Sequence, residues 1–277
     1  MSAPAPQSTD TVDGLSVLRR RPVHHDPDAP TVVVVHGAMD RAASFSRTMR
    51  RTGALDVVAY DRRGYAGSLS AGVAHDVAAH ARDLARIIDW SGAGRVVVVG
   101  HSLGGTIGAA LAVVGDDRVV ALAAFESPFP ALDDSFDQIG AGAVQLAGEV
   151  GFEAAAEHFY RLMVGEATWS RVRERDRAAR RAEGPALIAE LADLRRRDHA
   201  IDPRELALPL LVGRGSTSSD RMRAGAELLA AAAPVAALVE IAGAGHGAHL
   251  THPDEFARFC TAAAALVPNP GVAAPGR

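Results

Sequence analysis

The sequence predicts an α/β protein with a mostly parallel central sheet of about eight strands, flanked by helices and carrying one helical insertion. Short runs rich in β-branched residues alternate with longer helical patterns, which is typical of parallel strands joined by helices. Residues 31–35 are apolar or β-branched throughout, as expected for a central strand buried on both faces. Residues 128–204 contain helical patterns only, and therefore read as an insertion between two strands.

Each expected element follows from one of these patterns. Strands are expected at residues 31–35, 55–60, 95–99, 119–125, 208–212 and 235–241, with a hairpin within residues 12–23 at one sheet edge. Helices are expected at residues 75–90, 103–114, 221–232 and 254–266. We therefore expect a core of residues 11–127 and 205–267, a helical cap at 128–204, a disordered N-terminus at 1–10 and a loose C-terminal tail at 268–277.

Composition excludes several classes of function. The 277 residues have a formal net charge of −4, and no clustered basic surface of the kind that nucleic-acid partners require is indicated. No apolar stretch approaches the roughly 20 residues needed to span a bilayer, and the first residues do not resemble a signal peptide, so we expect a cytoplasmic protein. The single cysteine, Cys260, cannot form an internal disulfide and is expected to pack in the last helix.

The strongest motif is Gly100-His101-Ser102-Leu103-Gly104, which stands between four valines and a helical pattern. A Gly-x-Ser-x-Gly motif between a strand and a helix presents the serine hydroxyl on a tight turn, beside helix N–H groups that stabilise an anion. Ser102 is therefore the candidate nucleophile. His101 points to the other side of such a turn, and we interpret it as a packing or substrate-binding residue.

Two further motifs occur in order before this turn. His36-Gly37 follows the strand at 31–35, and Asp61-Arg62-Arg63-Gly64-Tyr65-Ala66-Gly67-Ser68 follows the next strand, with Ala66 where a glycine is commoner. With the serine motif, they make the chain resemble the α/β-hydrolase superfamily over residues 12–267. The resemblance implies the α/β-hydrolase fold. It also implies an oxyanion hole made by the backbone N–H groups of Ala38 and Leu103.

A serine hydroxyl needs a base to take its proton. His246 lies in a glycine-rich loop after the last expected strand and matches the late catalytic histidine of this superfamily. His249 and His252 are nearby rivals, but His252 precedes Pro253 at the start of the final helix.

The acid that orients the histidine is less obvious from the sequence. In related proteins it commonly lies where this chain has Ser218, which cannot be anionic. Glu126 ends the apolar strand at 119–125, a position that carries the acid in some members of the superfamily, including certain haloalkane dehalogenases. Asp220 is the alternative, although an aspartate before a helical pattern is also a favoured N-cap. We favour Glu126.

The resemblance implies hydrolysis of a carboxylic ester or related acyl bond in a small-molecule substrate, without cofactor or metal. Acyl transfer, thioesterase, lactonase, amidase or carbon–carbon hydrolase chemistry, cofactor-free perhydrolase or haloperoxidase-like chemistry, and a non-catalytic ligand-binding role remain alternatives. Alkyl-halide chemistry does not fit, because it requires an aspartate nucleophile. Met39, His101 and Phe129 are candidate substrate contacts. The oligomeric state stays open.

Overall fold

A computed structural model describes residues 7–26, 28–133, 135–196 and 200–267. Its central sheet has eight strands: β1 (Gln7–Val12), β2 (Leu15–Arg20), β3 (Thr31–Val35), β4 (Val57–Tyr60), β5 (Val96–His101), β6 (Val119–Phe125), β7 (Leu210–Gly215) and β8 (Ala236–Ile241). Their order in the sheet is β1-β2-β4-β3-β5-β6-β7-β8. β1 pairs with β2 and β2 with β4 antiparallel, and all other pairs are parallel, as expected.

The edge hairpin lies closer to the N-terminus than the sequence suggested. β1 begins at Gln7, so residues 7–10, expected to be disordered, pair with β2 instead. Asp13 and Gly14 both have positive φ, 48° and 83°, which suits the tight two-residue turn that an Asp-Gly pair favours. That dipeptide is the sequence signal for the true position of the hairpin. The first six residues and the tail at 268–277 lie outside the described residues.

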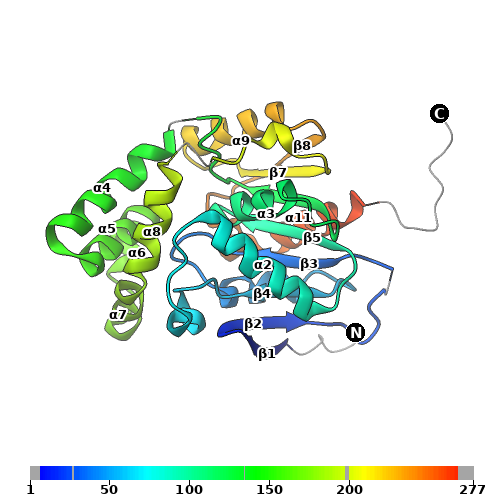
Figure 1. Cartoon of the computed structure of the whole chain (residues 1–277), viewed down its shortest axis with the longest axis horizontal. Coiled ribbons are helices and arrows are strands. Elements are labelled where there is room, and N and C mark those ends of the chain that lie inside the picture. The colour runs from blue at the N-terminus through cyan, green and yellow to red at the C-terminus, as the bar shows by residue number, and fades with distance from the viewer. Residues whose placement is uncertain (1–6, 27, 134, 197–199, 268–277) are drawn as a thin grey trace.

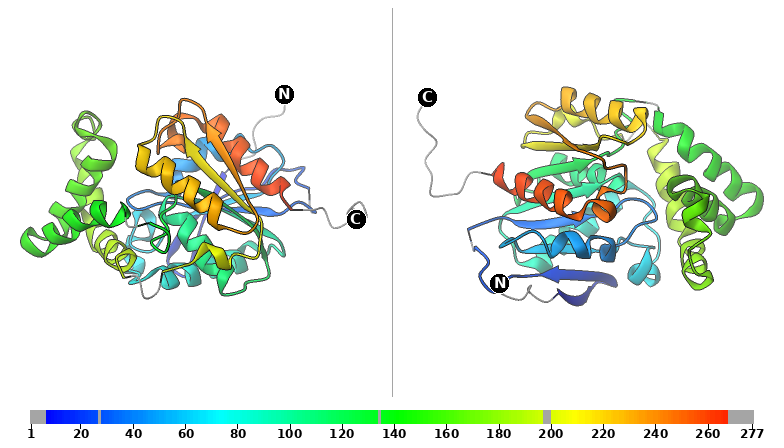
Figure 2. Two further views of the ribbon diagram at one scale, coloured as in Figure 1. Left: turned by 90° about the horizontal axis from the view of Figure 1, so that it is seen from above. Right: turned by 180° about the vertical axis from the view of Figure 1, so that it is seen from behind.

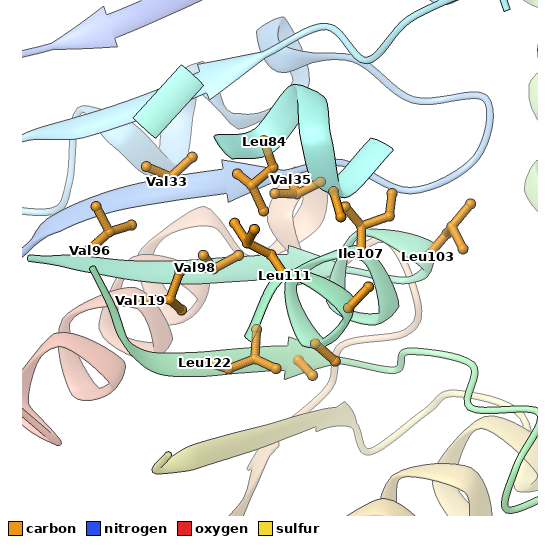
Figure 3. Close-up of a cluster of buried hydrophobic side chains, with 14 of the residues drawn as sticks. Val33, Val35, Leu84, Val96, Val98, Leu103, Ile107, Leu111, Val119 and Leu122 are labelled. Carbon is orange, nitrogen blue, oxygen red and sulfur yellow. The ribbon is translucent and has the colours of Figure 1, made fainter. Parts of the chain in front are cut away.

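Helices cover both faces of the sheet. α2 (Val77–Ser91), α3 (Leu103–Val113) and α9 (Asp220–Ala232) pack on one face, while α1 (Ser46–Met49) and α11 (Pro253–Ala265) pack on the other. Figure 3 shows Leu84 of α2 and Ile107 of α3 beside the valines of the central strands. Short elements complete the core: η1 (Ala42–Phe45), η2 (Ala66–Ala71), η4 (Pro203–Glu205) and α10 (Ala248–Thr251).

The insertion between β6 and β7 is helical. It consists of α4 (Ser135–Val150), α5 (Phe152–Val164), α6 (Glu166–Trp169), α7 (Glu174–Ala182) and α8 (Gly184–Leu194). These helices form a separate layer beside one end of the sheet, seen from three directions in Figures 1 and 2. The chain enters this layer directly after β6, so the layer lies at the carboxyl ends of the parallel strands. Ligands of open α/β sheets bind at that end.

Buried carboxylates attach the insertion to the core. Glu190 of α8 pairs with the fully buried Arg62 and accepts a 2.8 Å hydrogen bond from Tyr65 Oη, while His80 Nε2 lies 2.9 Å from it. Glu183 accepts hydrogen bonds of 3.1 Å from Arg41 and from the Ala66 N–H. Removing one partner of a buried pair leaves an uncompensated charge, which typically costs about 3–5 kcal/mol. These pairs therefore fix where the insertion docks.

In the part of the chain that the structure describes, no helix is both long and apolar enough to cross a membrane.

Replacing Ala66 by glycine is expected to stabilise the protein. Its φ of 43° lies in the left-handed region, which costs a residue with a Cβ roughly 1–2 kcal/mol. Glycine removes this strain but adds about 0.4–1 kcal/mol of unfolded-state entropy. We expect Ala66→Gly to raise the free energy of unfolding by about 0–1 kcal/mol, measured by urea denaturation. The control Ala224→Gly, at an exposed site within α9, should lower it by about 1 kcal/mol. If Ala66→Gly lowered the free energy of unfolding as much as Ala224→Gly does, Ala66 would not be strained.

Glu190 should make stability depend on pH in the acid range. Burial raises its pKa, but the Arg62 charge and the hydrogen bonds from His80 and Arg62 outweigh burial and lower the pKa to about 2. A lowered folded-state pKa gives stability that is present above the ordinary value of about 4.3 and is lost as the pH falls towards 2. The stability gap between the wild type and Glu190→Gln should therefore narrow from pH 6 to pH 3 in urea titrations.

Glu255→Gln is the control, because Glu255 is a half-exposed carboxylate of α11 that pairs with Arg258. The difference in free energy of unfolding between Glu255→Gln and the wild type should stay small from pH 6 to pH 3. A gap for Glu190→Gln that is constant over the whole range would show that the Glu190 charge is not linked to folding.

Candidate active site

Ser102 occupies a strained turn between β5 and α3. Its φ of 52° and ψ of −129° are unfavourable for a residue with a Cβ, and such strain costs about 1–3 kcal/mol and clusters at functional sites. The Ser102 N–H donates to the Phe125 carbonyl at 2.8 Å, which ties the turn to β6. Ser102 is only partly buried although the residues on both sides of it are buried. The turn therefore presents the serine hydroxyl out of the core.

The two glycines of the motif are required by backbone packing. A Cβ at Gly100 would lie 2.1 Å from the Gly105 nitrogen, and a Cβ at Gly104 would lie 2.0 Å from the Val35 carbonyl oxygen. Neither contact can be relieved by turning a side chain, because the opposing atoms are backbone. The spacing Gly-x-Ser-x-Gly is thus the one that lets α3 start this close to β3 and β5.

His246 and Glu126 form a partly buried pair next to this turn. His246 Nδ1 lies 2.7 Å from Glu126 Oε2, and the Glu126 side chain is 0% exposed. The other oxygen, Oε1, accepts a 2.7 Å hydrogen bond from the Gly215 N–H at the end of β7. Since the carboxylate accepts at Nδ1, that nitrogen carries the proton and Nε2 keeps a free lone pair.

Electrostatics keep Glu126 ionised. Burial pushes its pKa up, but the hydrogen bond and charge of His246 and the Gly215 N–H outweigh burial, so the pKa lies below the ordinary glutamate value. Glu126 also has a positive φ of 47°. The unfavourable backbone and the buried charge are both compensated by these specific contacts, which is typical of a functional position.

The alternative acid, Asp220, lies elsewhere. Its side chain is 96% exposed and pairs with Arg223, one turn further along α9. The N-cap of α9 is Ser219, whose hydroxyl accepts from the Met222 N–H, so the expectation that Asp220 caps this helix is wrong. Ser218, at the position where related proteins commonly carry the acid, is buried. The structure brings Glu126 to His246 and leaves Asp220 in solvent.

The two expected oxyanion donors flank Ser102. Leu103 is the first residue of α3, where a backbone N–H has no partner within the helix. Ala38 follows the His36-Gly37 turn, and both residues line the same cavity as Ser102. His36 is buried and accepts the Arg62 N–H at Nε2, so its Nδ1 donates to the Gly37 carbonyl at 2.7 Å. Burial, followed by the charge of Arg62, lowers the pKa of His36 to about 3, so it stays neutral.

A small apolar cavity of about 50 Å³ contains Ser102 and His246. The insertion supplies most of its apolar wall, through Phe159, Met163, Leu191 and Leu194. A wider cavity of about 490 Å³ adjoins it and shares Met163, Met222 and His246 with it. A larger cavity of about 860 Å³ lies between α2, α3 and the end of α8, and neither Ser102 nor His246 lines it.

The three residues predicted to contact substrate do not line the Ser102 cavity. Met39 packs under the insertion and Phe129 packs in the main core. His101 is buried, and its Nε2 donates to the His246 carbonyl at 2.8 Å, so it supports the histidine loop. The sequence patterns did not indicate the wall of the Ser102 cavity, because it lies where helices of the insertion meet the core. The apolar residues Phe159 and Met163 within the helical pattern were the available signal.

One group of side chains has the donor types of a metal site. Ligand atoms of Asp40, His101 and His249 all lie within 4.8 Å of one another. Asp40 Oδ2 is 3.0 Å from His249 Nε2; burial raises the Asp40 pKa, but the proximity of His249 outweighs burial and lowers it. His249 is thus already the partner of this carboxylate, and none of the three residues lines the Ser102 cavity.

Comparison with known proteins places this geometry in a family. Residues 32–259 match the model of the alpha/beta hydrolase family, which is more than half of the chain. A putative carbamate hydrolase, RutD, of Caulobacter segnis is 29% identical over 266 residues, covering 90% of this chain and 96% of that protein.

Two further likenesses are more limited in scope. Epoxide hydrolase A of Mycobacterium tuberculosis is 34% identical over 133 residues, and the match spans only 40% of its length. The structure of an enol-lactonase from Burkholderia xenovorans LB400 superposes with a TM-score of 0.69 at 21% identity, over 91% of this chain and 97% of that one. That last likeness concerns the fold. Together with the family match and the observed sheet, it leads to one conclusion: the chain belongs to the α/β hydrolase family.

Proposed function

We propose that this protein is a serine hydrolase that cleaves a carboxylic ester or a related acyl bond through an acyl-enzyme. The observation that carries the proposal is the 2.7 Å contact between His246 Nδ1 and Glu126 Oε2, because His246 lines the same cavity as the strained Ser102. This pairing leaves His246 Nε2 free to accept a proton. A nucleophile, a base and an orienting acid are the three parts of a catalytic triad.

The steps follow from these roles. Ser102 Oγ attacks the carbonyl carbon while His246 Nε2 takes its proton, and Glu126 stabilises the resulting imidazolium. The Ala38 and Leu103 N–H groups hold the oxyanion, each contributing about 3–4 kcal/mol of transition-state stabilisation. His246 returns the proton to the leaving group, and a water activated in the same way then releases the acid and restores Ser102.

The nucleophile decides between carbonyl and epoxide substrates. An epoxide opened by a serine would leave an ether on the enzyme, which the same histidine cannot hydrolyse. A carbonyl substrate leaves an ester on the enzyme, and the histidine can activate water to hydrolyse that ester. The partial likeness to an epoxide hydrolase is therefore outweighed by Ser102. The full-length likeness to a putative carbamate hydrolase makes a carbamate the second candidate, since a carbamate also carries a carbonyl carbon.

Two substitutions separate the two candidate acids, Glu126 and Asp220. Glu126→Gln removes the charge that stabilises the His246 imidazolium, so kcat on p-nitrophenyl butyrate should fall about 10²–10⁴-fold. Asp220→Asn changes an exposed side chain and should leave kcat within twofold. Steady-state kinetics of both variants decide between them. Loss of turnover in Asp220→Asn alone would overturn the assignment of Glu126.

A fluorophosphonate probe supplies the control for the nucleophile. It should label the wild type once per chain, at Ser102, and leave Ser102→Ala unlabelled. A wild type that is not labelled would indicate a non-catalytic member of the family.

The small cavity beside Ser102 should limit the length of the acyl chain. A volume of about 50 Å³ accommodates only a few heavy atoms, since one water needs about 10–15 Å³ on this measure. We expect kcat/KM on p-nitrophenyl esters to peak between acetate and butyrate. Met163→Ala should shift the peak to longer chains, because Met163 lines both the inner and the outer cavity and its truncation enlarges the inner one.

Leu162→Ala is the matched control. Leu162 is the exposed neighbour of Met163 on α5 and lines only the outer cavity, so the peak should not move. An octanoate optimum in the wild type would contradict the assignment of the inner cavity as the acyl site.

A further inference from the structure

The direction of the Ala38 N–H is set by the carbonyl before it. The Gly37 C=O and the Ala38 N–H belong to one peptide unit, which is planar and trans, so the two bonds point in opposite directions. Whatever holds the Gly37 oxygen therefore aims the Ala38 N–H. The next residue, Met39, has a positive φ of 58°, so the turn is held in an unfavourable conformation and needs external support.

Arg62 supplies that support together with His36, whose Nδ1 donates to the Gly37 carbonyl at 2.7 Å. Arg62 Nε donates to the His36 carbonyl at 2.9 Å and Arg62 Nη2 donates to the Gly37 carbonyl at 3.0 Å. The guanidinium is planar and rigid, so two of its N–H groups fix two successive carbonyls at once. The side chain is completely buried, so these bonds do not compete with water.

Glu190, from the insertion, holds Arg62 in place. Both of its oxygens face the guanidinium, with Oε1 bonded to Nη1 and Oε2 at 3.3 Å from Nη2. Tyr65 Oη donates to Oε2, and His80 lies against Oε1, so the carboxylate is held from three sides. Glu190 also lines the Ser102 cavity. A chain of contacts thus runs from α8 through one carboxylate and one guanidinium to the peptide that carries the oxyanion donor.

We propose that Glu190 is a positioning residue for the oxyanion hole: through Arg62 it aims the Ala38 N–H, so that docking of the helical insertion completes the active site. The inference rests on the proposed function of Ser102 and Ala38. Substrate recognition by the insertion and stabilisation of the transition state are then linked, because the same helix, α8, supplies Leu191 and Leu194 to the cavity wall and Glu190 to the turn.

The test uses the rate at which a fluorophosphonate modifies Ser102. In this reaction a bond forms between Ser102 Oγ and phosphorus, fluoride leaves, and the phosphoryl oxygen occupies the oxyanion hole. No natural substrate is needed. Glu190→Gln should lower the second-order rate constant about 10–100-fold, since one donor is misdirected rather than removed. On p-nitrophenyl butyrate, kcat should fall by a similar factor while KM stays within threefold.

Asp193→Asn is the matched control. Asp193 lies one turn from Glu190 on α8 and accepts a 2.8 Å hydrogen bond from the Val77 N–H of the core, so it also joins the insertion to the core, but away from the turn. Its rate constant should stay within twofold of the wild type. Hydrogen exchange in residues 36–40 should speed up in Glu190→Gln and not in Asp193→Asn.

A double variant shows whether Glu190 acts through Arg62. Arg62→Met should lower the rate as Glu190→Gln does, and adding Glu190→Gln to Arg62→Met should lower it no further. Tyr65→Phe, which removes one hydrogen bond to Glu190 and leaves no charge unpaired, serves if Glu190→Gln does not fold, with an expected two- to tenfold loss.

The outcomes are distinct. A wild type that is not labelled at Ser102 overturns the proposed function. If the wild type is labelled normally and the folded Glu190→Gln variant reacts at an unchanged rate, only the positioning role of Glu190 is overturned. If Glu190→Gln does not fold, an unchanged rate in Tyr65→Phe has the same meaning. Fully additive losses for Arg62 and Glu190 overturn the route through the guanidinium.

Discussion

The close approach of α3 to the central strands is the constraint on which the rest of the site depends. The backbones of Gly100 and Gly104 lie against atoms of Gly105 and Val35 with no room for a Cβ. This contact forces Ser102 into a strained conformation and places the N-terminus of α3 directly behind it. This strained backbone thus provides a partly exposed hydroxyl at Ser102 and, at Leu103, an N–H with no partner within the helix. The buried sheet around it stabilises the strain.

Charge is handled in this protein by pairing buried carboxylates with fixed donors. Glu126 faces His246 and the Gly215 N–H, and Glu190 faces Arg62, Tyr65 and His80. In both cases burial opposes ionisation, and hydrogen bonds and neighbouring charges outweigh it. Each carboxylate joins segments that are far apart in the sequence. We infer that these two groups position different parts of the site, Glu126 through the base and Glu190 through the oxyanion turn.

Much of the fold was predictable because its patterns are local. β3 consists of one threonine followed by four valines, which predicts a buried strand. The structure has this strand with the same bounds, Thr31–Val35. The hairpin was misplaced because its exposed first strand carries no apolar alternation, and only the Asp13-Gly14 turn marks it. The choice of Glu126 over Asp220 followed from the resemblance to family members that carry the acid at this strand end, and from the cost of burying an unpaired charge there.

The sequence by itself determined the α/β sheet and the serine turn, because strand periodicity and the glycine requirement of a tight turn depend on neighbouring residues. The predictions for His246 and Glu126 came from the resemblance to the family. Only the tertiary structure decided which cavity Ser102 faces, that Met39, His101 and Phe129 lie outside its wall, and that Glu190 reaches Arg62 across 128 positions. Contacts of this kind depend on how the insertion docks. Docking is set by the complementary packing of two surfaces, which no single segment encodes.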